Sequence, residues 1–251
     1  MSGHNKWSTI KNKKAKTDAQ RGKIFTKIGR EIVIAVREGG GSDPAVNGKL
    51  RDVITKAKAA NMPGDNIMRS IKKAAGEGES VNYKEIMYEG YAPGGVAVIV
   101  EIVTDNINRT ASEVRHIFDK CGGSLGANGC VAWMFERKGV IELDNEKGLD
   151  EDEIMMLALD AGAADVEVED DGNAVIYTDP NDFSQVRENL ENAGCSFLNA
   201  EREMVPTNTV DITDPELAAK VNRLIEWLED YDDSQNVYHN ANLPDEPEED
   251  E

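Results

Sequence analysis

The 251-residue sequence has few of the residues that build metal centres, disulfide frameworks or nucleophilic active sites. It contains three histidines and three cysteines, and the cysteines, Cys121, Cys130 and Cys195, lie 9 and 65 positions apart. This spacing fits neither a set of paired cysteines nor a CxxC metal-binding motif. We therefore expect core or near-core thiols in a reducing compartment, and we expect neither a bound metal nor a cofactor.

Long apolar segments and catalytic motifs are also missing. No run of about 18 apolar residues is present, and the N-terminus lacks the apolar segment of a signal peptide. The sequence has no HExxH, P-loop or GxSxG motif, and His4, His116 and His239 are scattered along it. These absences predict a cytoplasmic protein with no membrane partner, no enzymatic activity and no small-molecule substrate.

Basic residues are scarce overall but unevenly distributed. The sequence has 28 Lys and Arg against 48 Asp and Glu, a formal net charge of −20. Residues 1–80 hold 17 basic and 8 acidic residues, a net charge of +9, whereas residues 81–251 hold 11 basic and 40 acidic residues, a net charge of −29. This asymmetry predicts an end that binds polyanions, joined to a body that repels them.

A basic arm begins the chain. Residues 2–23, SGHNKWSTIKNKKAKTDAQRGK, contain seven Lys and Arg and a single acidic residue, Asp18. Residues 2–16 show neither helical nor strand periodicity, so we expect them to form a flexible arm. The lysines of this arm can neutralise several phosphates and release their counterions, and Trp7 can stack on an unpaired base.

The helix predicted after the arm has a basic side. Thr17-Asp18-Ala19-Gln20 has the form of a capping box. At about 100° per residue, Lys23, Lys27 and Arg30 project opposite an apolar stripe. The alternative is that these side chains are merely the solvated face of a helix. The candidate nucleic-acid-binding residues are His4, Lys6, Trp7, Lys11, Lys13, Lys14, Lys16, Arg21, Lys23, Lys27 and Arg30.

A second candidate is the segment YEGYAPGG, residues 88–95, directly before a predicted buried strand. Its two tyrosines, its proline and its three glycines favour a recognition loop that exposes aromatic surface. The residues of this predicted loop are Tyr88, Glu89, Tyr91 and Pro93. The alternative is a hairpin turn in which the two tyrosines pack on the edge of a domain.

Helical periodicity in residues 1–80 predicts three short amphipathic helices that form a small bundle. Apolar positions recur every three or four residues in Ile24–Val36, Leu50–Ala57 and Ile67–Ala74. Gly39-Gly40-Gly41 should end the first helix, and Ser42-Asp43-Pro44 should cap the second.

Beyond residue 80 the pattern changes to that of an α+β protein. Val96–Val103 is almost continuously apolar and predicts a buried strand, residues 108–121 predict a helix, and Val131–Phe135 predicts a strand. Residues 139–205 read β-α-β-β-α-β, the ferredoxin-like order. A strand, a helix and a further strand are predicted within residues 210–239.

We therefore expect an α+β fold in which an N-terminal three-helix bundle is followed by two α+β domains, the ferredoxin-like one inserted within the other. The expected boundaries are 1–80 for the basic arm and three-helix domain, 81–138 plus 206–240 for the α+β domain, 139–205 for the inserted ferredoxin-like domain, and 241–251 for an acidic disordered tail.

Four segments of the chain form motifs that are specific enough to indicate a family: GHNKWSTIKNKKAKTDAQRGKIFTK, AANMP, YEGYAPGGVAVIVEIVTDNINRTASEVR and GGSLGANGCVAWMFERKG. They resemble the YebC family, and the similarity runs from residue 2 to about residue 240. The resemblance implies a helical N-terminal domain and two α+β domains. The chain departs from the family at Asn5 and Asn12, where Ser and His are frequent, at Ala92, where Gly is usual, and at Cys130, where a small polar residue is usual. None of these departures removes a basic or aromatic candidate residue.

The resemblance implies a regulator of gene expression, because the family is described as probable transcriptional regulators that bind DNA. Its mitochondrial relatives act as translational activators, and bacterial members have been implicated in helping ribosomes through proline-rich sequences. The first hypothesis is therefore a non-enzymatic, DNA-binding regulator of transcription. The second is a translation factor that binds ribosomal RNA, with the ribosome as its partner, and assists elongation through stalling sequences.

The charge of the body favours the second hypothesis. A net charge of −29 over residues 81–251 makes wrapping on long duplex DNA electrostatically costly, whereas one basic end can bind a large RNA site. A third hypothesis is a protein-interaction module whose arm is only a solvated extension. Such a module would show no salt-dependent binding of nucleic acid.

Overall fold

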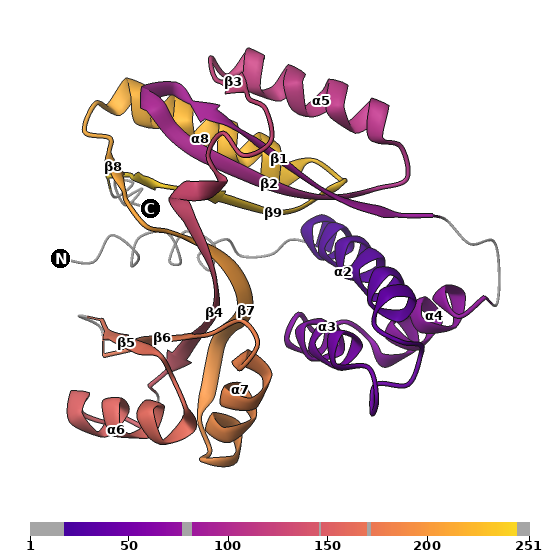
Figure 1. Cartoon of the computed structure of the whole chain (residues 1–251), viewed down its shortest axis with the longest axis vertical. Coiled ribbons are helices and arrows are strands. Elements are labelled where there is room, and N and C mark those ends of the chain that lie inside the picture. The colour runs from indigo at the N-terminus through magenta and orange to yellow at the C-terminus, as the bar shows by residue number, and fades with distance from the viewer. Residues whose placement is uncertain (1–17, 77–81, 146, 170–171, 245–251) are drawn as a thin grey trace. The chain divides into compact units, whose positions relative to one another are not determined.

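The computed structural model describes residues 18–76, 82–145, 147–169 and 172–244 (Figure 1). The chain divides into two compact units. One unit comprises the chain up to Met134 together with the chain from Asn208 onward, and the other comprises Phe135–Thr207.

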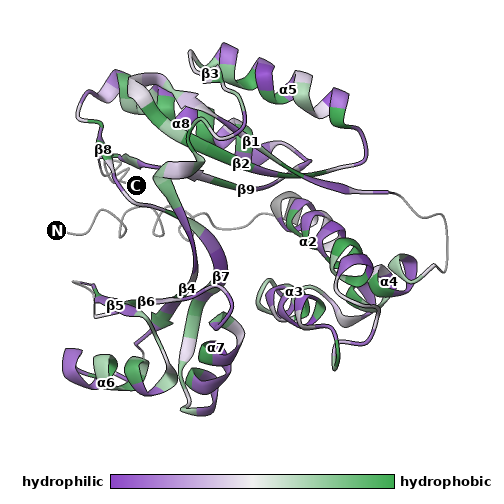
Figure 2. Cartoon of the chain, in the orientation of Figure 1, coloured by the Kyte–Doolittle hydropathy of each residue, from purple (hydrophilic) through white to green (hydrophobic). Residues whose placement is uncertain are grey.

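The first unit begins with three helices that enclose a small apolar core. They are α2 (Asp18–Glu38), α3 (Gly48–Ala59) and α4 (Gly64–Ala74). Hydrophilic and hydrophobic residues alternate along α2, as the colours in Figure 2 show. The core side chains come from all three helices and include Ile28, Ile32, Leu50, Ala57, Ile67 and Ile71. The predicted helical bundle is therefore present.

The predicted cap of the second helix was wrong. Residues 42–47 form bends and turns, and α3 begins five residues later than the Ser42-Asp43 signal suggested. Asn47 is the N-cap: its side chain accepts a hydrogen bond from the Leu50 amide and donates to the carbonyls of Ala35 and Gly41. Because this buried amide satisfies groups on both sides of the turn, the helix starts at Asn47.

The rest of the first unit is an antiparallel sheet covered on one face by two helices. The sheet order is β3-β1-β2-β9. Its strands are β1 (Lys84–Ala92), β2 (Val96–Thr104), β3 (Ser124–Leu125) and β9 (Ser234–His239). The helices are α5 (Ile107–Lys120) and α8 (Pro215–Asp230).

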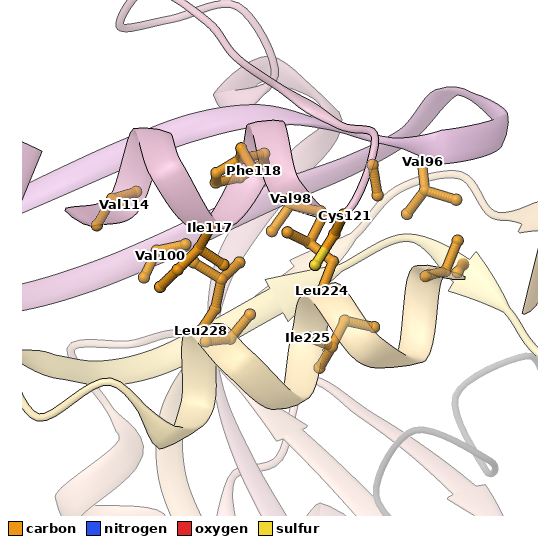
Figure 3. Close-up of a cluster of buried hydrophobic side chains, with 14 of the residues drawn as sticks. Val96, Val98, Val100, Val114, Ile117, Phe118, Cys121, Leu224, Ile225 and Leu228 are labelled. Atoms are coloured by element: carbon orange, nitrogen blue, oxygen red, sulfur yellow. The ribbon is translucent and has the colours of Figure 1, made fainter. Parts of the chain in front are cut away.

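Side chains of α5 and α8 meet over β2 to form the largest core of this unit (Figure 3). The figure shows Val114, Ile117 and Phe118 of α5 together with Leu224 and Leu228 of α8. All five side chains are buried. A strand buried on both faces needs a continuous apolar run, which β2 has. A helix buried on one face needs apolar residues every three or four positions, which α5 and α8 have.

Two short strands complete the first unit. Val210–Asp211 (β8) pairs in parallel with Ala241–Asn242 (β10). Ala241 and Leu243 are buried, so the acidic tail predicted from residue 241 does not begin there. Residues 245–251 lie outside the described residues.

The second unit has the ferredoxin-like order β-α-β-β-α-β. Its elements are β4 (Phe135–Asp144), α6 (Glu151–Ala161), β5 (Asp165–Val168), β6 (Ala174–Thr178), α7 (Phe183–Asn192) and β7 (Ser196–Pro206). The strands are antiparallel in the order β5-β6-β4-β7. The core joins the inward side chains of α6 and α7 to the sheet, among them Ile141, Ile154, Ile176, Phe183 and Leu190.

The expected strand at Val131–Phe135 was wrong. Ala132–Met134 is a short 3₁₀ helix, η2, and β4 begins only at Phe135. The backbone amides of Val131 and Ala132 donate to the Glu89 carboxylate and are therefore not available to a strand partner. The α+β class and the three-part architecture are otherwise as predicted.

Candidate nucleic-acid interface

The predicted basic site falls partly within the described residues. His4, Lys6, Trp7 and the arm residues Lys11, Lys13, Lys14 and Lys16 lie outside them. Arg21, Lys23, Lys27 and Arg30 lie on α2, and the structure therefore bears on these four side chains alone.

Two of the α2 lysines contact the C-terminal end of α8. Lys23 Nζ lies 3.4 Å from Asp230 Oδ1, and Lys27 Nζ donates to the Glu229 carbonyl oxygen at 2.7 Å. The last turn of α8 contains no basic residue of its own. The α2 lysines therefore supply the positive charge that the carbonyls and dipole at a helix C-terminus favour. Burial lowers the pKa of Lys27 to about 8, although Glu229 opposes the shift.

Arg30 contacts the turn that follows α8. Its Nη1 donates to Asp233 Oδ1 at 3.0 Å and to the Asp232 carbonyl oxygen. The Arg30 side chain is only 16% exposed and that of Asp233 only 5%. This ion pair is accordingly shielded from solvent, unlike the exposed Lys23–Asp230 pair.

Asp233 is the centre of a buried polar cluster. Four side chains besides Arg30 donate to its carboxylate: Arg109 (2.7 Å), Thr110 (2.8 Å), Thr104 (3.0 Å) and Tyr231 (3.1 Å). Burial by itself raises the pKa of Asp233, but these hydrogen bonds outweigh it and hold the pKa below its ordinary value. The carboxylate therefore stays ionised and joins β2, α5 and the α8–β9 turn to α2.

Intramolecular contacts thus occupy three of the predicted nucleic-acid-binding residues. Lys23, Lys27 and Arg30 are directed at α8 and the turn after it, and Arg21 is exposed one turn earlier. The basic side of α2 is real, but its central part contacts the body of the same unit.

A basic face that the sequence analysis missed lies on α4. Arg69, Lys72 and Lys73 are exposed, and within the described part of the chain none of them has a hydrogen-bond or ion-pair partner. At about 100° per residue they project away from Ile67 and Ile71, which enter the helical core. The same wheel that revealed the basic side of α2 would have revealed this face, had it been applied to the shorter helix.

The predicted recognition loop is mostly a strand. Tyr88, Glu89 and Tyr91 belong to β1, which pairs with β2 from Lys84 opposite Thr104 to Ala92 opposite Val96. Only Pro93–Gly95 forms the turn, where Gly94 and Gly95 adopt positive φ values of 82° and 77°. Glycine accommodates this conformation without strain. The segment is therefore a hairpin, as the alternative predicted, but Tyr88 packs against the core and not on the edge of the domain.

The side chains of this segment point in different directions. Tyr88 packs against the core beneath α5 and α8, and burial raises its pKa. Tyr91 is half-buried and donates to the Cys130 carbonyl oxygen at 3.2 Å. Glu89 is 4% exposed and accepts hydrogen bonds from the loop before β4. Pro93 is half-buried at the turn.

The His, Cys, Asp and Glu side chains of the described residues are not gathered into a metal-binding cluster. Within them, no cluster of three or more His, Cys, Asp or Glu side chains has the geometry to hold a metal ion. His116 is exposed on α5, whereas His239 is buried in β9. No helix in this part of the chain is long and apolar enough to cross a membrane.

Comparison with known families matches nearly the whole chain. Residues 5–77 match the family described as "TACO1/YebC protein N-terminal domain". Residues 83–241 match the family described as "TACO1/YebC second and third domain". The two matches meet close to the junction between α4 and β1.

Curated relatives resemble the chain along its full length. A protein of Acetivibrio thermocellus is 62% identical over 240 residues, covering 96% of this chain and 98% of its own. A protein of Clostridium novyi is 57% identical over 246 residues, covering 98% and 99%. Both are named "Probable transcriptional regulatory protein".

A solved structure shows the same fold. The crystal structure of a conserved hypothetical protein from Aquifex aeolicus superposes with a TM-score of 0.85 at 50% sequence identity. The match covers 96% of this chain and 98% of that one.

Proposed function

Because the chain belongs to the TACO1/YebC family, we propose that it is a non-enzymatic, cytoplasmic regulator of gene expression that binds nucleic acid through its N-terminal end. The names of its relatives favour DNA as the target and transcription as the process. The binding surface in this proposal consists of the basic arm and the exposed face of α4.

The observation that carries the proposal is the division of charge. Residues 1–80 have a net charge of +9 and residues 81–251 a net charge of −29. A polyanion is therefore attracted to one end of the chain and repelled by the rest. Arg69, Lys72 and Lys73 add three exposed basic side chains on α4.

A second candidate function is a translation factor on ribosomal RNA. The acidic body favours it, because a single basic end can enter an RNA site while the body remains in solvent. Long duplex DNA would instead bring phosphates close to the body. The two candidates share the N-terminal contact and differ only in the nucleic acid that it binds.

In-cell ultraviolet crosslinking of the tagged chain, with both RNA and DNA sequenced, tests the proposal. The test variant carries Lys11→Glu, Lys13→Glu and Lys14→Glu. The matched control carries the same charge change on the body, at Lys120, Lys220 and Arg223. Promoter DNA that is lost in the test variant and kept in the control supports the transcriptional function.

Other outcomes of the crosslinking experiment would support the translational function or contradict nucleic-acid binding through the N-terminal end. Ribosomal or transfer RNA with the same pattern of loss would replace the transcriptional function with the translational one. Recovery of neither nucleic acid, or equal recovery with both variants, would contradict binding through the N-terminal end.

A further inference from the structure

Trp133 is presented to solvent by a segment that is otherwise fixed. Its exposed fraction is 69%, whereas Val131 is 0% and Phe135 is 6% exposed. We call residues 126–134 the tryptophan loop. A single exposed apolar side chain is common in soluble proteins, so exposure by itself shows no function. The way in which this loop is held is the more informative feature.

Glu89 holds the tryptophan loop against β1. One carboxylate oxygen accepts from the Gly129 amide at 2.6 Å, and the other accepts from the amides of Val131 (2.9 Å) and Ala132 (2.8 Å). Burial raises the pKa of Glu89, but these three hydrogen bonds outweigh it and lower the pKa below its ordinary value. An ionised, buried carboxylate thus fixes the backbone on the N-terminal side of Trp133.

The indole N–H is also satisfied within the protein. Trp133 Nε1 donates to the Cys130 carbonyl oxygen at 3.1 Å, and Tyr91 Oη donates to the same oxygen at 3.2 Å. A Cβ at Gly126 would collide with Cys130 Sγ, so the loop closes tightly at this point. With its N–H engaged, the indole offers a partner its ring surface and not a hydrogen bond.

The surroundings of Trp133 in the sequence are unusual for this chain. Residues 121–134, CGGSLGANGCVAWM, contain no charged side chain, although 30% of the whole sequence is charged. Acidic side chains elsewhere in residues 81–251 repel phosphate, whereas these fourteen residues carry none, and the Glu89 carboxylate that their loop encloses is buried and hydrogen-bonded to three backbone amides. A fixed aromatic ring in a segment without charged side chains suits a flat ring carried on an anionic backbone.

We propose that Trp133 stacks on an unpaired base of the nucleic acid that this chain binds. The inference rests on the proposed function and gives the acidic body a contact of its own with the ligand. Glu89 and Tyr91 are positioning residues in this proposal, because they hold the loop and touch no base.

Tryptophan fluorescence of the full chain tests the stacking directly. The substitutions Trp7→Phe and Trp227→Phe leave Trp133 as the single reporter. Titration with short oligouridine and oligothymidine strands should quench its emission, while the anisotropy of a dye on the strand reports binding independently. Unchanged emission at saturating binding would overturn the stacking and leave the proposed function intact. No binding at low salt, by this variant or by the unaltered chain, would contradict both.

Affinity measurements add a second criterion. Trp133→Ala should weaken single-strand binding by about 5- to 100-fold and leave its salt dependence unchanged, because stacking releases no counterions. Trp133→Phe should retain part of the affinity. Trp227→Ala, which removes another exposed tryptophan, on α8, is the matched control and should have no effect. An effect of equal size in both alanine variants would overturn the proposal.

The role of Glu89 is tested by motion at Trp133. Glu89→Gln replaces one carboxylate oxygen with an amide that cannot accept a hydrogen bond. In the single-tryptophan chain, the fluorescence anisotropy of Trp133 should fall and strand affinity should decrease with it. Reduced affinity at unchanged Trp133 anisotropy would exclude a positioning role.

Discussion

Asp233 and Glu89 are both buried carboxylates. Different kinds of hydrogen-bond donor stabilise the ionised form of each. Asp233 accepts from side chains, and its partners Thr104 and Thr110 lie 129 and 123 positions away in the sequence. Glu89 accepts from backbone amides 40 to 43 positions away. Neither environment has a periodic signature, so single-residue patterns gave no indication that these acids are buried.

Asp233→Asn should destabilise the fold by roughly 3 kcal/mol, because it removes the charge that Arg30 and Arg109 share and leaves buried donors unpaired. Urea denaturation of the full chain measures this loss. Asp232→Asn, at the exposed neighbouring position, is the control and should change stability by less than about 0.5 kcal/mol. Equal effects of the two substitutions would mean that the cluster does not stabilise the fold.

His239 makes stability depend on pH in a defined range. Burial lowers its pKa from 6.5 to about 4, so the unfolded chain binds a proton that the folded chain excludes. The free energy of unfolding is therefore unaffected by this titration above about pH 6.5. It falls as the pH decreases toward 4, by up to roughly 3 kcal/mol. Urea midpoints between pH 4 and 7 measure the decline.

His239→Asn is the matched variant for this titration. In the unaltered chain, His239 Nδ1 accepts a hydrogen bond from the Ala241 amide. The asparagine side chain retains an acceptor for this amide and has no titrating group. The variant should lose the decline between pH 6.5 and 4. A decline of the same size in the variant would assign the pH dependence to other groups.

At the scale of elements, α2 and α4 both have basic sides, but the two sides face different surroundings. Lys23, Lys27 and Arg30 contact α8 and the turn that follows it. Arg69, Lys72 and Lys73 are exposed on α4. A helical wheel identifies both sides equally well, and only tertiary contacts distinguish a docking surface from a free one.

Replacing Arg69, Lys72 and Lys73 together with Gln should weaken nucleic-acid binding. The log–log dependence of affinity on salt should become shallower by up to about 2 to 3, since each lost phosphate contact removes about 0.7 to 0.9 from the slope. Fluorescence titration at several salt concentrations provides the slope. The control is Lys49→Gln with Lys56→Gln, because these lysines pair with Glu38 and Glu31. A slope equal to that of the unaltered chain would remove α4 from the interface.

Sequence periodicity predicted most elements and missed those stabilised by distant partners. The period of α5 and α8 and the apolar run of β2 follow directly from burial on one face or on both. β1 was missed because Tyr88–Ala92 has the composition of a loop. Its Glu89 and Gly90 are buried by residues of the tryptophan loop and by Phe118, and no local pattern encodes those contacts.

At the scale of the whole molecule, Phe135–Thr207 forms a separate unit with its own core. Its first and last strands pair along their length, with Phe135 opposite Pro206 and Asp144 opposite Ser196. The two ends of the unit are therefore adjacent. The segment contains 20 Asp and Glu against 5 Lys and Arg, so its net charge of −15 repels phosphate.

Isolated 135–207 should fold cooperatively and bind no nucleic acid. A chain in which a short Gly-Ser linker replaces residues 136–206 should keep both its fold and its nucleic-acid affinity, apart from effects at Trp133. Circular dichroism on heating and strand titration measure these properties. Loss of most of the affinity from the shortened chain would place essential contacts on the ferredoxin-like unit.

The candidate site was predicted less completely than the fold. Charge asymmetry is the basis for proposing the N-terminal end, because net charge sums over a segment and needs no geometry. It did not separate Arg69 and Lys72, which have no partner among the described residues, from Lys27 and Arg30, which contact α8 and the turn after it. Trp133 escaped notice because its distinguishing feature is the set of hydrogen bonds that hold its loop.

The adjacent ends of β4 and β7 also determine how the molecule responds to force. Tension applied along the chain pulls Phe135 and Pro206 apart. The force acts along the hydrogen bonds that join the antiparallel strands β4 and β7. These hydrogen bonds then break one after another, starting at the Phe135–Pro206 end. They do not bear the force together, as they would if the two strands were pulled lengthwise past each other. The ferredoxin-like unit is therefore mechanically weak in the direction in which its own chain connects it, whatever its stability toward heat or urea.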